Sequence, residues 1–190
     1  TAGGLCNPTA VKDDGGGYAT VPAAYIAIPI DDRVTFGLGF SVPFGLATSW
    51  SGSKTTAFNA TDSEIETLNI NPNLAVKVTD KFSIGFGLDA MEFKATLDSA
   101  VNLAGGLLPS SLVKNYADDW GFGWNAGAMY QFTDATRVGL SYRSQVHVQP
   151  TGTSSIQGGV LNNVKSENAK TAIMLPAMTM LSIYHAFADK

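Results

Sequence analysis

Apolar and polar residues alternate strictly along several stretches of the chain, which is typical of β-strands with one apolar face. In one of them Val34, Phe36 and Leu38 alternate with Thr35 and Gly37. The alternating stretches are Val34–Val42, Leu68–Val78, Phe82–Asp89, Trp120–Phe132 and Val138–Val148. With Pro22–Ile30 and Thr171–Phe187 they predict about seven strands, each with a core long enough to cross a bilayer.

Short turns with aspartate recur between these stretches at nearly even intervals. The aspartates are Asp32, Asp80, Asp134 and Asp189. The far ends of the strands are joined by longer segments, which we interpret as loops, at Phe44–Asp62, Ser99–Asp118 and Thr151–Lys170. The first and third are rich in Ser, Thr, Asn and Gly and are expected to be solvated, whereas the middle one contains several leucines. Short turns on one side and long loops on the other are typical of an outer-membrane barrel.

The glycines of the alternating stretches all fall on the polar face. They are Gly37, Gly39, Gly85, Gly87, Gly121, Gly123, Gly127 and Gly139. Glycine on the solvent face of a soluble sandwich weakens a strand without return. On the lumen wall of a barrel it widens the bore or lets an inner segment approach the backbone. The pattern therefore favours an all-β fold, an antiparallel transmembrane β-barrel with its apolar face toward lipid.

Composition and strand number narrow the class further. No run of eighteen apolar residues is present, so no transmembrane helix is predicted. The net charge of −4 without clusters of Lys or Arg argues against a nucleic-acid partner. Because bacterial barrels have an even number of strands, we expect the chain to be an internal fragment of a barrel about twice as long. Cys6 is the only cysteine, and its role and partner stay open.

No group of residues in the sequence has the arrangement of a catalytic or metal-binding site. His147 and His185 fall on different strands and opposite faces, and no acid and nucleophile share a face with either. We therefore expect a protein that is not an enzyme and that needs no cofactor or metal.

Several sequence segments closely resemble the long-chain fatty acid transporters of Gram-negative outer membranes (FadL type), a family that includes aromatic-hydrocarbon channels. The most specific segments are Asp119–Phe132 and Arg137–Val146, and Pro43–Thr48, Glu66–Asn73 and Leu175–Pro176 agree in the same order. The resemblance covers Val21 to Lys190. It implies a fourteen-stranded monomeric barrel in the bacterial outer membrane. Residues 1–190 would then be one partial barrel domain that lacks the N-terminal hatch and the C-terminal strands.

By resemblance, such a protein takes up hydrophobic molecules by passive diffusion. Ligand lands in an apolar groove between extracellular loops, enters the lumen and leaves sideways into membrane lipid through a kinked strand. Leu103, Leu107, Leu108 and Leu112 recur at helical spacing in one loop that the resemblance makes groove-forming. The alternative is that these leucines pack onto a neighbouring loop.

The kinked strand corresponds to Val34–Thr48. Its irregularity falls at Pro43, Phe44 and Gly45, because proline has no N–H for the ladder and glycine tolerates unusual dihedrals. An ordinary strand end at the loop is the alternative.

Basic residues expected in the lumen are candidates for binding a carboxylate head group. They are Lys94, Arg137 and Arg143. A buried cation attracts a carboxylate by a charge-assisted hydrogen bond. Alternatively, these cations pair with lumen acids such as Asp89, Glu92 or Asp119.

The sequence thus predicts an outer-membrane channel for long-chain fatty acids or other hydrophobic compounds. Alternatives are an aromatic-hydrocarbon channel of the same family and a structural or adhesive barrel without transport. A general aqueous porin is disfavoured, since the polar face is rich in glycine and carries few charges.

Overall fold

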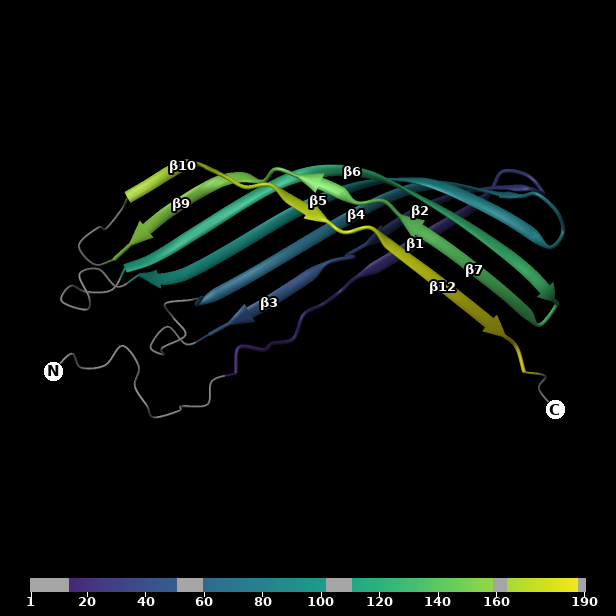
Figure 1. The fold of residues 1–190 in the computed structure, drawn as a ribbon, viewed down its shortest axis with the longest axis horizontal. Helices are drawn as coiled ribbons and strands as arrows, with labels where there is room; N and C mark the ends of the chain where they lie inside the picture. The colour runs from purple at the N-terminus through teal and green to yellow at the C-terminus, as the bar shows by residue number, and fades with distance from the viewer. Residues whose placement is uncertain (1–13, 51–59, 102–110, 159–163, 188–190) are drawn as a thin grey trace.

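The computed structural model of the chain describes residues 14–50, 60–101, 111–158 and 164–187. In this part the chain forms β-strands, and no helix is long and apolar enough to cross a membrane. Figure 1 shows the strands of the main sheet side by side in an arch. Cys6 and three of the four predicted loop leucines (Leu103, Leu107 and Leu108) lie outside the described residues.

Seven strands form the main path of the sheet, in the order β1-β2-β4-β5-β6-β7-β12. Their bounds are β1 Ala23–Pro29, β2 Val34–Ser41, β4 Asp62–Lys77, β5 Phe82–Val101, β6 Ser111–Thr133, β7 Thr136–Arg143 and β12 Met178–His185. All neighbours are antiparallel. The predicted all-β antiparallel sheet is confirmed, and its described edges, β1 and β12, are not joined into a closed barrel.

Five shorter strands extend or leave this path. β3 (Gly45–Ser49) adds to β4, while β9 (Thr151–Gln157) adds to β6 and β10 (Val164–Lys170) adds to β9. β8 (Val146–Val148) and β11 (Ile173–Leu175) pair only with each other. We call this pair the β8–β11 ribbon.

The short turns are stabilised by side chains that accept backbone hydrogen bonds. The Asp31 carboxylate accepts from the amides of Arg33 and Val34, both at 2.7 Å. These two bonds hold the pKa of Asp31 below its ordinary value. In the next turn the Thr79 hydroxyl accepts from Phe82 N at 3.0 Å. The capping residues are therefore neighbours of the aspartates marked in the sequence.

The two faces of the sheet exchange character along the long strands. In β5 one face carries Ile84, Phe86 and Leu88 but continues with Glu92 and Lys94, whereas the other face carries Asp89 and continues with buried Met91 and Phe93. The register with β4 and β6 runs through this point without a shift. A strand of 20 residues is about twice as long as the hydrocarbon requires, so it extends beyond the lipid. We call the face of Asp89 the inner face and the face of Phe86 the outer face.

The structure differs from the sequence prediction in three segments. The segment Thr151–Lys170 is not a solvated loop, because β9 and β10 pair across it. Most of Ser99–Asp118 belongs to β5 and β6, and the fourth leucine, Leu112, lies in β6 opposite Ala100. The stretch Val138–Val148 is not one strand, since it leaves the sheet after Arg143 and forms β8.

Candidate functional site

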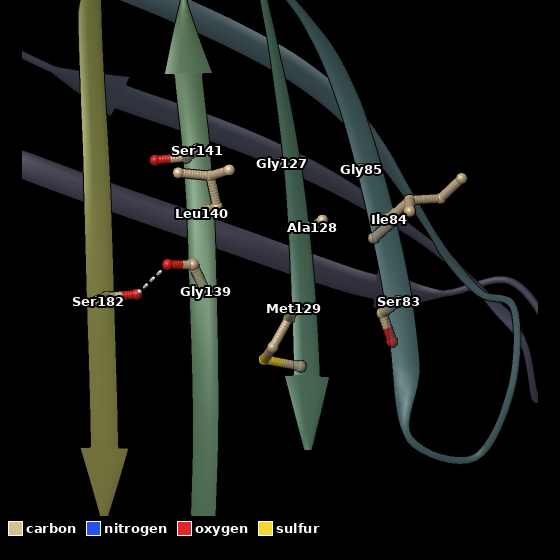
Figure 2. A pocket seen from close by; sticks show the side chains of 11 residues that line it. Ser83, Ile84, Gly85, Gly127, Ala128, Met129, Gly139, Leu140, Ser141 and Ser182 are labelled. Atoms are coloured by element: carbon tan, nitrogen blue, oxygen red, sulfur yellow. Dashed lines mark hydrogen bonds between the residues drawn. The ribbon is translucent and has the colours of Figure 1, made fainter. Parts of the chain in front are cut away.

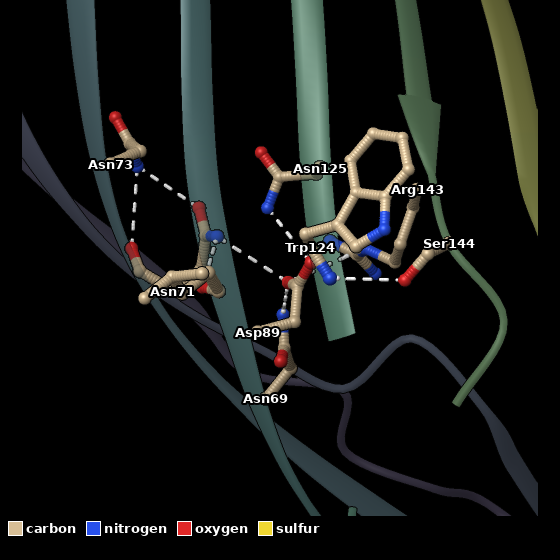
Figure 3. Close-up of polar contacts among 9 residues, drawn as sticks. Asn69, Asn71, Asn73, Asp89, Trp124, Asn125, Arg143 and Ser144 are labelled. Carbon is tan, nitrogen blue, oxygen red and sulfur yellow. Dashed lines mark hydrogen bonds and ion pairs between the residues drawn. The ribbon is translucent and has the colours of Figure 1, made fainter. Parts of the chain in front are cut away.

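A buried carboxylate organises the middle of the inner face. Asp89 is 1% exposed and accepts hydrogen bonds from three asparagine amides, which are Asn69 at 2.6 Å, Asn71 at 3.3 Å and Asn125 at 2.8 Å. These side chains come from β4, β5 and β6 and converge on one point, as Figure 3 shows. Burial of a charge is tolerated when it is paired and fully hydrogen-bonded.

Arg143 compensates the charge of Asp89. Its Nε lies 3.5 Å from Asp89 Oδ1, and its side chain is a quarter exposed. The guanidinium carries five N–H donors, four of them on its two Nη nitrogens. The pair is neutral overall, yet one edge of the guanidinium can still donate to a ligand on the inner face.

A glycine gives the asparagines the room they need. A Cβ on Gly87 would lie 2.8 Å from Asn73 Cβ and 2.9 Å from Asn125 Oδ1. Both contacts are closer than side-chain atoms normally approach. The glycines that the sequence placed on the polar face therefore do allow close approach by inner groups, here side chains of the same sheet.

An apolar cluster lies beside the polar one, toward the loop ends of the strands. Met91, Phe93 and Ala95 of β5 pack against Val146, Val148 and Leu175 of the β8–β11 ribbon, with Phe44, Ile65 and Ile173 at the margin. Val146 and Val148 are each 1% exposed. Full burial stabilises such a side chain by about 1.5–3 kcal/mol, so the ribbon is held on the inner face mainly by apolar contact.

The ribbon crosses β6 where β6 has glycines. A Cβ on Gly121 would lie 2.7 Å from Val148 Cγ1 and 3.0 Å from the carbonyl oxygen of His147. A Cβ on Gly123 would lie 2.8 Å from Val146 Cγ2. Larger residues at these positions would push the ribbon away from the wall.

Hydrogen bonds fix β8 to β6 at both ends. At one end Ser144 N donates to Trp124 O at 2.9 Å, and Trp124 N donates to Ser144 Oγ at 3.0 Å. At the other end Gln149 N donates to a carboxylate oxygen of Asp119 at 2.6 Å. Side chains thus replace the strand partner that β6 loses where the chain turns inward.

The break between β2 and β3 lies where the sequence predicted a kink. Ser41 pairs with Asn69 and Gly45 pairs with Glu66. The three residues Val42, Pro43 and Phe44 therefore face only two residues of β4, which is the count of a β-bulge.

One buried hydroxyl stabilises this break. Thr67 Oγ1 accepts from Phe44 N at 3.0 Å and donates to Phe44 O at 2.7 Å. Thr67 is 3% exposed. Since Pro43 has no N–H, the Thr67 side chain supplies the partner that the ladder cannot.

A cavity of about 460 Å³ adjoins the break. It is lined by residues 17–21, Val42, Gly45–Ala47 and Glu64–Glu66. A Cβ on Gly45 would meet only Ile65 O, at 3.9 Å, so this glycine leaves open space at the cavity wall.

A second hollow, of about 320 Å³, lies nearer the short turns. Figure 2 shows its small lining residues, among them Gly85, Gly127 and Gly139, on three adjacent strands. Ser182 Oγ donates to Gly139 O at 3.3 Å at its edge. It contains no charged lining residue, and we assign it no role in binding.

The three predicted lumen cations do not lie together. Arg143 is beside Asp89, as the pairing alternative anticipated. Arg137 is on the inner face near the turns, with its guanidinium carbon 4.4 Å from the Tyr184 ring centroid. Lys94 instead lies on the outer face and pairs with Glu92 at 3.0 Å. The physical reason is the strict alternation of β5, which puts Lys94 on the face of Leu88 and Glu92 rather than on the face of Asp89.

The asparagines and Thr67 were not anticipated as site residues. Asn69, Asn71 and Asn73 do recur at period two, which put them on the polar face. The presence of three asparagines on one face of one strand is the sequence feature that could have indicated a buried polar cluster. In the described part of the chain no three His, Cys, Asp or Glu side chains gather as metal ligands.

Known proteins agree with this architecture. The family described as outer membrane protein transport protein (OMPP1/FadL/TodX) matches residues 3–190. The chain is 33% identical over 196 residues to the 47 kDa outer membrane protein of Pasteurella multocida, covering 90% of this chain and 46% of that protein. It is 29% identical over 206 residues to a long-chain fatty acid transport protein of Escherichia coli, with 90% and 46% covered.

Two crystal structures share the fold. A Pseudomonas aeruginosa FadL homologue superposes with a TM-score of 0.79 at 24% identity, over 100% of this chain and 51% of that one. The Ralstonia pickettii toluene transporter TbuX gives 0.69 at 23% identity, over 88% and 51%. The chain therefore spans about half the length of the proteins it matches.

These matches define the class, an outer-membrane β-barrel transport protein. More particularly, the chain belongs to the OMPP1/FadL/TodX family of the Gram-negative outer membrane.

The Thr67 hydroxyl can be tested by isosteric replacement in the complete barrel. Thr67→Val leaves the amide and carbonyl of Phe44 without partners, so we expect the free energy of unfolding in lipid vesicles to fall by about 1–3 kcal/mol. Thr67→Ser keeps the hydroxyl and should recover most of this loss. The control is Thr35→Val, since the Thr35 hydroxyl has no hydrogen bond among the described residues. Equal stabilities of the two valine variants would contradict the assignment.

Proposed function

We propose that this chain forms part of an outer-membrane channel for passive uptake of long-chain fatty acids or other hydrophobic compounds. The complete protein would be a fourteen-stranded monomeric barrel with an N-terminal hatch. The family membership supports transport as the class of function. Relatives named for fatty acid transport and for toluene transport support hydrophobic substrates.

The observation that carries the proposal is the break at Val42–Phe44 with its adjoining cavity. A local irregularity with a cavity beside it fits lateral release into lipid, whereas a uniform, unbroken wall would favour a structural or adhesive barrel. The break is held by Thr67 and carries Phe44 on the inner face. We propose that ligand leaves the lumen here, past Pro43, Phe44 and Gly45.

Arg143 is our proposed contact for a carboxylate head group. Its Nε is engaged by Asp89, which orients the guanidinium, and the Nη edge donates to the ligand. Lys94 is not proposed for this role because it lies on the outer face. Capture by the loop that contains Leu103, Leu107 and Leu108 remains a proposal from the sequence.

Blocking the break tests lateral release directly. Gly45→Trp fills the cavity, so we expect uptake of oleate by cells that lack their own transporter to fall to the background level. Gly45→Ala is the matched control, because the added Cβ makes only an ordinary contact. Both variants should reach the outer membrane in normal amount. Normal uptake by a correctly folded Gly45→Trp protein would refute lateral release at this break.

A neutral double variant tests the head-group contact. Arg143→Gln with Asp89→Asn removes both charges together and leaves no buried ion unpaired. We expect a raised KM for oleate and an unchanged rate of toluene uptake, since toluene has no carboxylate. Arg137→Gln, also on the inner face, should change neither. Equal loss for both substrates would mean that Arg143 serves the fold rather than the ligand.

A further inference from the structure

The β8–β11 ribbon covers the inner surface between the two parts of the proposed site. The polar part is at Asp89, and the break is opposite Phe93, because Thr67 pairs with Phe93. Met91, which pairs with Asn69, lies between them. Met91 and Phe93 are 0% and 1% exposed, although they face the inside of an open sheet. The ribbon is what buries them.

The break itself is packed against the same cluster. Phe44 is partly buried among these residues, so its side chain and the ribbon share one apolar contact surface. An apolar ligand that moves from Arg143 to the break has to cross Met91 and Phe93. It therefore competes with Val146, Val148 and Leu175 for the surface on which they now lie.

The way the ribbon is attached permits such a displacement. Its two strands pair through only three residues each, outside the main sheet. β8 is tied to β6 through Ser144 and through Asp119, at its two ends. Between these ends its contact with β6 is made by valine methyl groups over glycines. Apolar contact has no fixed direction and is readily exchanged for contact with an apolar ligand.

We infer that the β8–β11 ribbon is an inner gate that must leave the surface of Met91 and Phe93 before ligand reaches the break. This inference rests on the proposed function. It adds a moving element and a route to the lateral exit. The ligand it fits is a flexible apolar chain or a small aromatic hydrocarbon, which can replace the valine and leucine contacts without needing hydrogen bonds.

A disulfide between the ribbon and the wall tests the gate. The Cβ position of Gly123 is 2.8 Å from Val146 Cγ2, so the two Cβ atoms are at most about 4.3 Å apart, within disulfide range. The lock is therefore Gly123→Cys with Val146→Cys, in a complete barrel carrying Cys6→Ser. The Gly123 position is preferred to Gly121 because its nearest backbone contact, Gln145 O, is 3.8 Å away, whereas His147 O lies 3.0 Å from the Cβ position of Gly121.

The same strand offers a matched control. Gly127 and Ser141 pair directly across β6 and β7, and the Cβ position of Gly127 lies 3.8 Å from Ser141 Cβ. Gly127→Cys with Ser141→Cys places a second disulfide on the inner face. It joins two wall strands that are already paired and leaves the ribbon free.

The measurement is oleate and toluene uptake by each protein, oxidised and then reduced with dithiothreitol. We expect the ribbon lock to lose uptake of both compounds when oxidised and to regain it on reduction, while the wall lock transports in both states. Full uptake by the oxidised ribbon lock would overturn the gate. Absence of uptake in every protein, including the parent, would instead count against the proposed function, so the two failures are distinguishable.

Discussion

The demand that every backbone polar group find a partner inside the membrane shapes this structure. A β-barrel meets the demand with its ladder, which leaves no group unpaired in lipid. This chain leaves its ladder twice, between β2 and β3 and between β7 and β9. In both places side chains replace the lost partner, Thr67 at the first and Ser144 with Asp119 at the second. Hydrogen bonds therefore fix the irregular segments as they fix the regular strands.

The two departures face the same inner surface. The ribbon formed at the second departure packs on Met91 and Phe93, and the margin of that cluster is Phe44 from the first. Glycines in β6 make the contact possible by leaving the inner side of the wall flat. The site therefore has two parts. In one, apolar side chains of the ribbon pack on the wall over glycines, and in the other the Asp89–Arg143 pair is neutral overall. Such a surface suits a ligand with an apolar body and at most one small charged group.

Periodicity predicted the seven main strands and their faces well, because a half-buried strand repeats every two residues. The prediction failed where the environment of a strand face changed while the two-residue repeat continued. Lys94 was expected in the lumen, but the alternation continues through Met91 without a slip and puts it on the outer face, which changes from apolar to charged beyond Leu88. The alternation puts Val146 on the apolar outer face. In the structure the chain stops pairing with β6 after Arg143, and Val146 turns to the inner face. The contacts of Asp89 with Asn69 and Asn125 join three strands, and no local pattern encodes them.

At both departures, side chains pair the backbone groups that have lost their ladder partners. Amide hydrogen exchange of the complete barrel in lipid measures this residue by residue. We predict that the amides of Phe44, Trp124 and Gln149 exchange as slowly as amides of the adjacent regular ladder, because each has a side-chain acceptor. Exchange at these three amides as fast as in unprotected loops would contradict it.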